Sequence, residues 1–111
     1  MSGQPPKPGS LDVASSTSDG TVTVTLCGEL DLASVGAFEE HLGTVERAAP
    51  ARIVLDILGL TFIDSSGLRV LLLANGRARE SGRELLLTPS TDAVQRVFEM
   101  TGAHDLLRFQ S

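Results

Sequence analysis

The residues of this chain best suited to chemistry are Asp64-Ser65-Ser66-Gly67, which stand between a β-type segment and an apolar run with helical spacing. This order predicts a strand, a short polar loop and a helix, with the hydroxyl group of Ser65 at the start of the helix. Unpaired backbone N–H groups and the positive end of the helix dipole are concentrated there, so a phosphate on this serine would be stabilised. The pattern indicates a serine that is modified rather than one that catalyses.

Catalysis by Ser65 lacks the other groups that it needs. A serine nucleophile requires a nearby base and a group that orients the base, yet His41 and His104 stand outside any polar cluster. No glycine precedes Ser65 as in the Gly-x-Ser-x-Gly elbow of hydrolases, and the sequence has no metal-ligand spacing or glycine-rich nucleotide motif. We therefore expect that the protein is not an enzyme and that it binds neither a cofactor nor a metal ion. A small hydrolase that uses Ser65 is the enzyme alternative, and a simple helix cap worth roughly 0.5–2 kcal/mol is the non-functional one.

Composition restricts the class of protein. The 111 residues suffice for one compact domain. A net charge of −5 and only 4% aromatic residues argue against nucleic-acid binding, which needs a basic face and rings that stack on bases. The sequence has no signal peptide and no long apolar span, so we expect a cytoplasmic protein without a membrane partner. The single cysteine, Cys27, excludes an intrachain disulfide and is expected to be buried, because it continues an alternating apolar run.

Strand-like and helix-like segments alternate along the chain. Residues 1–9 carry three of the five prolines and are predicted to be a disordered tail, and residues 10–109 form one domain. The predicted strands are residues 11–15, 21–26, 52–57, 84–88 and 106–109, and the predicted helices follow candidate caps within residues 31–34, at residue 64 and at residues 90–91. This order, β-β-α-β-α-β-α-β, predicts a single α/β domain. It has a mostly parallel sheet, an N-terminal hairpin and helices packed on one face.

Several side chains have more than one predicted role. Asp31 and Ser34 are candidate caps of the first helix, and Asp64 is expected both to cap the second helix and to hold the serine loop. Residues 58–63 read as a loop, so Leu58 is either an exposed partner contact or a plug at the end of the core. Met100 is placed on the inner face of the third helix by its spacing.

These motifs together resemble the bacterial anti-sigma factor antagonists, which are single STAS domains. Gly28-Glu29-Leu30-Asp31 is similar to the family's Gly-Glu-hydrophobe-Asp motif, and Ile53-Val54-Leu55-Asp56 to its central strand. Phe62 to Leu68 is similar, position by position, to the phosphorylation loop. Val97 to Gly102 is similar to the end of the third helix. The resemblance extends over residues 10 to 109.

The resemblance implies a partner switch in transcription regulation. The unmodified protein would bind an anti-sigma factor with serine-kinase activity and so release a sigma factor. Phosphorylation of Ser65 would end this binding, and a phosphatase would restore it. The implied partner surface comprises Asp31, Leu58, Asp64, Ser66, Gly67 and Arg69. The alternative is a STAS scaffold or regulatory module of a stressosome-like or transporter-linked system.

Overall fold

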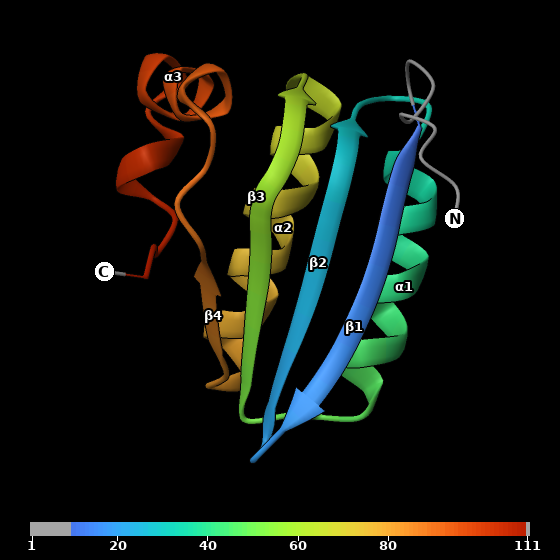
Figure 1. Ribbon diagram of the computed structural model, residues 1–111. Helices are drawn as coiled ribbons and strands as arrows, with labels where there is room; N and C mark the ends of the chain where they lie inside the picture. The colour runs from blue at the N-terminus through green and yellow to red at the C-terminus, as the bar shows by residue number, and fades with distance from the viewer. Residues whose placement is uncertain (1–9, 111) are drawn as a thin grey trace.

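A computed structural model of the protein describes residues 10–110, which form a four-stranded sheet in the order β1-β2-β3-β4 (Figure 1). β1 pairs antiparallel with β2, whereas the pairs β2–β3 and β3–β4 are parallel. The predicted α/β domain with an N-terminal hairpin and a mostly parallel sheet is therefore confirmed. The expected tail of residues 1–9 lies outside the described residues. The strands are β1 (Leu11–Ser18), β2 (Thr21–Leu30), β3 (Arg52–Ile63) and β4 (Glu84–Leu87).

The helices connect the parallel strands. α1 (Val35–Arg47) joins β2 to β3, α2 (Ser65–Ser81) joins β3 to β4, and α3 (Asp92–Thr101) follows β4 and leads into a 3₁₀ turn, η1 (Ala103–Asp105). α1 and α2 lie behind one face of the sheet, and α3 lies past the short β4, near the upper part of β3 (Figure 1). No helix within residues 10–110 is long and apolar enough to cross a membrane.

One face of the sheet forms the core with the helices. In β2, Val22, Val24 and Leu26 are buried, whereas the threonines between them are only half-buried, as strand alternation predicts. Phe38 and Leu42 of α1 are completely buried, in keeping with the apolar spacing of this helix. Burial of each such side chain stabilises the fold by about 1.5–3 kcal/mol. The packing between the sheet and the helices therefore holds the strand ends in place.

The prediction of a loop after residue 57 is wrong, because β3 continues through Leu58 to Ile63. The strand keeps its pairing with β2 through two register shifts, one between Thr25 and Cys27 and one between Gly28 and Glu29. Each bulge adds a residue on β3, bends the strand and changes which side chains face outward. Pairing with β2, about 30 residues away in sequence, thus determines that this segment is a strand.

Three smaller expectations are also corrected. Cys27 is exposed because it lies on the open face of the sheet, one position out of phase with buried Leu26. Met100 is 80% exposed, because Val94 and Phe98 already define the inner side of α3. The predicted last strand is reduced to one parallel bridge between Leu87 and Phe109.

Candidate functional site

Three segments meet at the carboxyl end of the parallel strands, at the top of Figure 1. They are the turn after β2 (residues 31–34), the end of β3, and the first turn of α2. In open α/β sheets this end is where ligands and partners usually bind, because loops rather than helix bodies border it. The segments that the sequence singled out around residues 31 and 65 are thus neighbours in space.

Ser65 is the first residue of α2 and its side chain is exposed. Asp64 is the N-cap: its Oδ1 accepts a hydrogen bond from the Gly67 N–H at 3.0 Å. Ser66 is half-buried in the same turn. The predicted strand-to-helix junction, with a hydroxyl at the helix start, is confirmed.

The carboxylate of Asp64 also joins α2 to the turn after β2. Its second oxygen, Oδ2, accepts a hydrogen bond from the Leu32 N–H at 3.2 Å. The Asp64 N–H in turn donates to the carbonyl oxygen of Leu30, also at 3.2 Å. One side chain therefore caps the helix, as expected, and also holds the turn after β2, a contact that the sequence did not predict.

The turn after β2 depends on Asp31 and Ser34. Asp31 Oδ1 accepts hydrogen bonds from the N–H groups of Ala33 and Ser34, at 3.0 and 3.2 Å. The buried Ser34 hydroxyl accepts from the Asp31 N–H and donates to the Glu29 carbonyl oxygen at 2.7 Å. Ser34 occupies the N-cap position of α1 but its side chain caps no helical N–H. The two residues therefore stabilise the turn rather than α1 itself.

This turn presents an exposed leucine that the sequence reasoning missed. Leu32 is 76% exposed, although its backbone is held by Asp64. The signal in the sequence was a large apolar residue between Asp31 and Ser34. An exposed apolar side chain next to the N-cap of α2 is suited to contact a partner protein.

Two glycines allow the backbone segments to approach closely. A Cβ on Gly67 would lie 2.5 Å from the Leu30 carbonyl oxygen, so α2 can abut β2 only if residue 67 has no side chain. Gly28 has a φ of +118°, and a Cβ there would also collide with the carbonyl oxygen of Ser10. The glycine of the Gly28–Asp31 motif is thus explained by backbone geometry.

Not every predicted site residue gathers at this end. Arg69 is exposed on α2 one turn after Ser65. Leu58 is 60% exposed, which excludes the core-plug role. It lies six residues before Asp64, on the bulged part of β3, and so at the margin of a surface centred on Ser65. Phe62, 48% exposed, is the nearer apolar residue of this strand.

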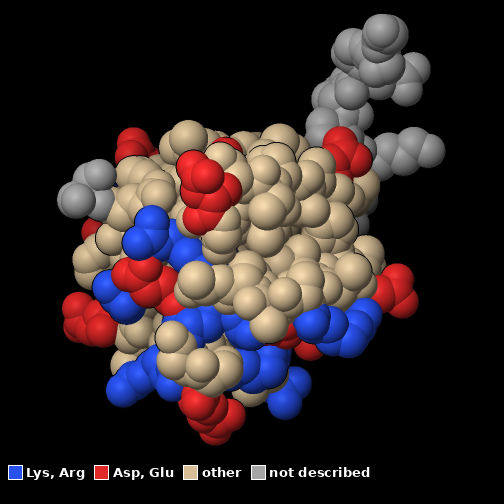
Figure 2. Space-filling view, turned by 90° about the horizontal axis from the view of Figure 1, so that it is seen from below, with Lys and Arg blue, Asp and Glu red and all other residues tan. Residues whose placement is uncertain are grey.

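Positive charge is concentrated at the other end of the molecule. Figure 2 shows arginine side chains gathered on the end seen from below, where β3 and β4 begin and α1 and α2 end. Ion pairs there join Arg52 Nε to Glu84 Oε1 at 2.7 Å and Arg77 Nε to Glu46 Oε2 at 3.0 Å.

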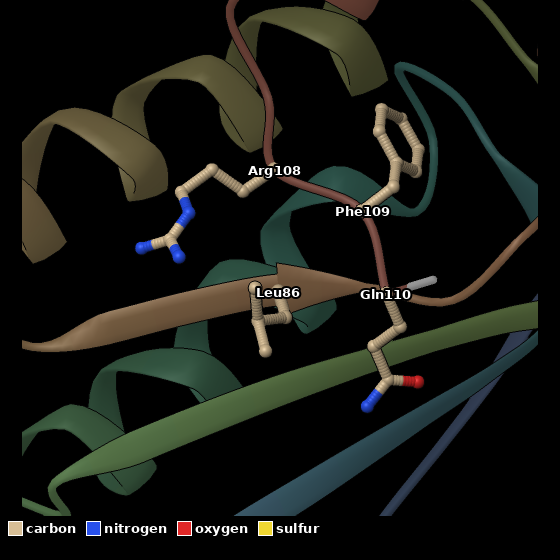
Figure 3. A pocket seen from close by; sticks show the side chains of 4 residues that line it. All are labelled: Leu86, Arg108, Phe109 and Gln110. Carbon is tan, nitrogen blue, oxygen red and sulfur yellow. The ribbon is translucent and has the colours of Figure 1, made fainter.

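A groove of about 510 Å³ lies beside β4, away from the serine. Leu86 of β4 and Arg108, Phe109 and Gln110 of the C-terminal segment line it (Figure 3). None of the predicted site residues contributes to this groove. Within residues 10–110, no three His, Cys, Asp or Glu side chains form a group that could hold a metal ion. The candidate site is therefore an exposed surface around Ser65.

Comparison with known proteins identifies the family. The family model described as "Mlab, STAS domain" matches residues 13–108. The chain belongs to the STAS-domain family. This STAS domain is 28% identical over 97 residues to the anti-sigma-B factor antagonist of Staphylococcus aureus (strain NCTC 8325 / PS 47), and the match covers 87% of this chain and 90% of the relative.

Solved structures share the fold of this STAS domain. An anti-sigma factor antagonist from Mycobacterium paratuberculosis superposes with a TM-score of 0.81 at 23% identity, covering 94% of this chain and 88% of the other. The unphosphorylated form of SpoIIAA gives 0.74 at 22% identity, covering 92% and 89%. The phosphorylated form of this Bacillus protein gives 0.67 at 21% identity, covering 92% of each chain. The Staphylococcus and Mycobacterium proteins and SpoIIAA are all named as anti-sigma factor antagonists.

Proposed function

We propose that this STAS domain is an anti-sigma factor antagonist whose binding is switched by phosphorylation of Ser65. The observation that carries the proposal is the exposed hydroxyl of Ser65 at the first position of α2, within an Asp-Ser-Ser-Gly segment. The membership of the STAS family and the antagonists among its relatives support this assignment.

The unmodified protein binds an anti-sigma factor through the surface around Ser65. Leu32 supplies apolar contact area and Arg69 a positive charge, since both are exposed beside the serine. Asp31 and Asp64 hold the two segments in register through their hydrogen bonds. Ser66 and Gly67 complete the first turn of the helix. Leu58 contributes at the margin of the surface.

The anti-sigma factor is also the kinase. It transfers the γ-phosphoryl group of ATP to the Oγ of Ser65: the new O–P bond forms, the bond to the β-phosphate oxygen breaks, and ADP and the hydroxyl proton leave. The phosphate adds about −1.5 to −2 charges at neutral pH. At a helix start this charge is locally favourable, so the fold persists, while added charge and bulk exclude the partner. A phosphatase reverses the modification in the cytoplasm.

The test uses Ser65→Ala and Ser65→Asp as baits in a lysate of the source bacterium, with Ser81→Ala, at the exposed far end of α2, as the matched control. Ser65→Ala and Ser81→Ala are expected to retain a protein kinase that also binds a sigma factor. Ser65→Asp should bind the purified partner more than a hundredfold more weakly, a loss of about 3 kcal/mol. Incubation of the parent with this kinase and ATP should place one phosphate on Ser65, located by mass spectrometry. Equal affinities of the alanine and aspartate variants at position 65 would end the proposal.

A further inference from the structure

Arg69 follows Ser65 by one turn of α2, and both side chains are exposed. Residues four apart on a helix project from the same face, with Cβ atoms about 5–6 Å apart. Side chains on a helix also lean toward its N-terminus, so a long side chain at position 69 reaches back toward position 65. The spacing thus brings the guanidinium group of Arg69 within reach of the serine hydroxyl.

No acidic side chain among residues 10–110 forms an ion pair with Arg69. Asp64, five residues before Arg69, uses one oxygen for the Gly67 N–H and the other for the Leu32 N–H. The first turn of α2 contains no acidic residue after this cap. The guanidinium group at position 69 is therefore available to a new anion.

We propose that Arg69 is the intrahelical counter-ion of phosphorylated Ser65. The inference rests on the proposed function, because it requires a phosphate at this serine. A phosphate at neutral pH is largely dianionic, and the guanidinium fork donates two parallel N–H bonds to such a group.

The pairing has a consequence for the switch. The phosphate and a carboxylate of a bound partner compete for the same guanidinium group. Phosphorylation of Ser65 therefore withdraws Arg69 from the docking surface in addition to adding negative charge to it. Phosphorylation thus removes the attraction between Arg69 and the partner and adds a repulsion between the phosphate and the partner at the same part of the surface.

The experiment installs phosphoserine at position 65 during translation, so that no kinase is needed, and titrates the phosphate by phosphorus-31 NMR. The parent is compared with Arg69→Gln, which removes the charge and keeps a polar side chain. Arg79→Gln is the matched control: Arg79 is exposed on the same helix, forms no ion pair within the described part of the chain, and lies about 21 Å from Ser65 along the axis. At 0.1 M salt that distance is twice the screening length of about 10 Å.

The pairing stabilises the dianion, so its loss in Arg69→Gln should raise the pH midpoint of the phosphorus resonance by about 0.2–0.4 pH unit. Arg79→Gln should titrate like the parent, and Arg69→Lys should restore most of the difference. Equal midpoints for Arg69→Gln and Arg79→Gln would overturn the inference. This readout involves neither kinase nor partner. A failure of the proposed function, seen as no transfer of phosphate to Ser65 by the bound kinase, is therefore distinguishable from a failure of the pairing.

Discussion

Replacing Gly67 by alanine tests whether the close contact between α2 and β2 determines the geometry of the site. The added Cβ would lie 2.5 Å from the Leu30 carbonyl oxygen and 2.9 Å from carbons of the Leu30 and Ile63 side chains. Contacts this short are not tolerated, so a backbone atom or two completely packed side chains must move. Leu30 is 0% and Ile63 3% exposed, which leaves no free space on that side.

The size of the effect follows from two opposing contributions. Overpacking of a filled site costs typically 1–3 kcal/mol. The higher helix propensity of alanine returns at most about 1 kcal/mol, and less near a helix end. Because the obstacle at Gly67 includes a backbone carbonyl, the net loss in the free energy of unfolding should be about 1–2 kcal/mol. For a domain of this size the melting temperature should fall by roughly 5–12 °C.

Gly76→Ala is the matched control on the same helix, because a Cβ at position 76 would meet no atom within 4 Å outside the neighbouring backbone of α2. It should gain about 0.5–1 kcal/mol from helix propensity alone. Urea unfolding followed by circular dichroism measures both variants. The two alanines should change stability in opposite directions. A Gly67→Ala protein as stable as the parent would refute the reasoning that this glycine is required for packing.

Two further substitutions each test the hydrogen bonds accepted by one side chain. Asp64→Ala removes the acceptor of the Gly67 and Leu32 N–H groups and should lower the free energy of unfolding by about 1–2 kcal/mol. Asp64→Asn should lose less stability, because asparagine also caps helices. Equal losses for the two variants in urea titrations would contradict the capping role. Thr88→Val leaves the buried Ile57 N–H without its 2.9 Å acceptor and should cost about 1–3 kcal/mol, while Thr88→Ser should stay near the parent value. If the Thr88→Val and Thr88→Ser proteins melt at the same temperature, the hydroxyl group at position 88 does not stabilise the fold by accepting from the Ile57 N–H.

Features that depend on neighbouring residues could be predicted from the amino-acid sequence. The apolar spacing of Phe38 and Leu42 predicts α1, because a helix brings residues four apart onto one face. The position of Ser65 at the start of α2 follows from the cap Asp64 and the glycine after it, which act within one turn. The order of strands and helices with short connections was enough to predict the mostly parallel sheet.

Which residues form surfaces depends on tertiary packing and could not be predicted in this way. Two bulges in β3 extend the strand and leave Leu58 exposed, and they exist because β2 supplies pairing partners about 30 residues away in sequence. The bond from Leu32 to Asp64 and the closeness of Gly67 to Leu30 likewise join segments more than 30 residues apart. Periodicity reports only which neighbours along the chain share a face. The meeting of distant segments is set by how the sheet and helices pack, and this packing builds the surface around Ser65.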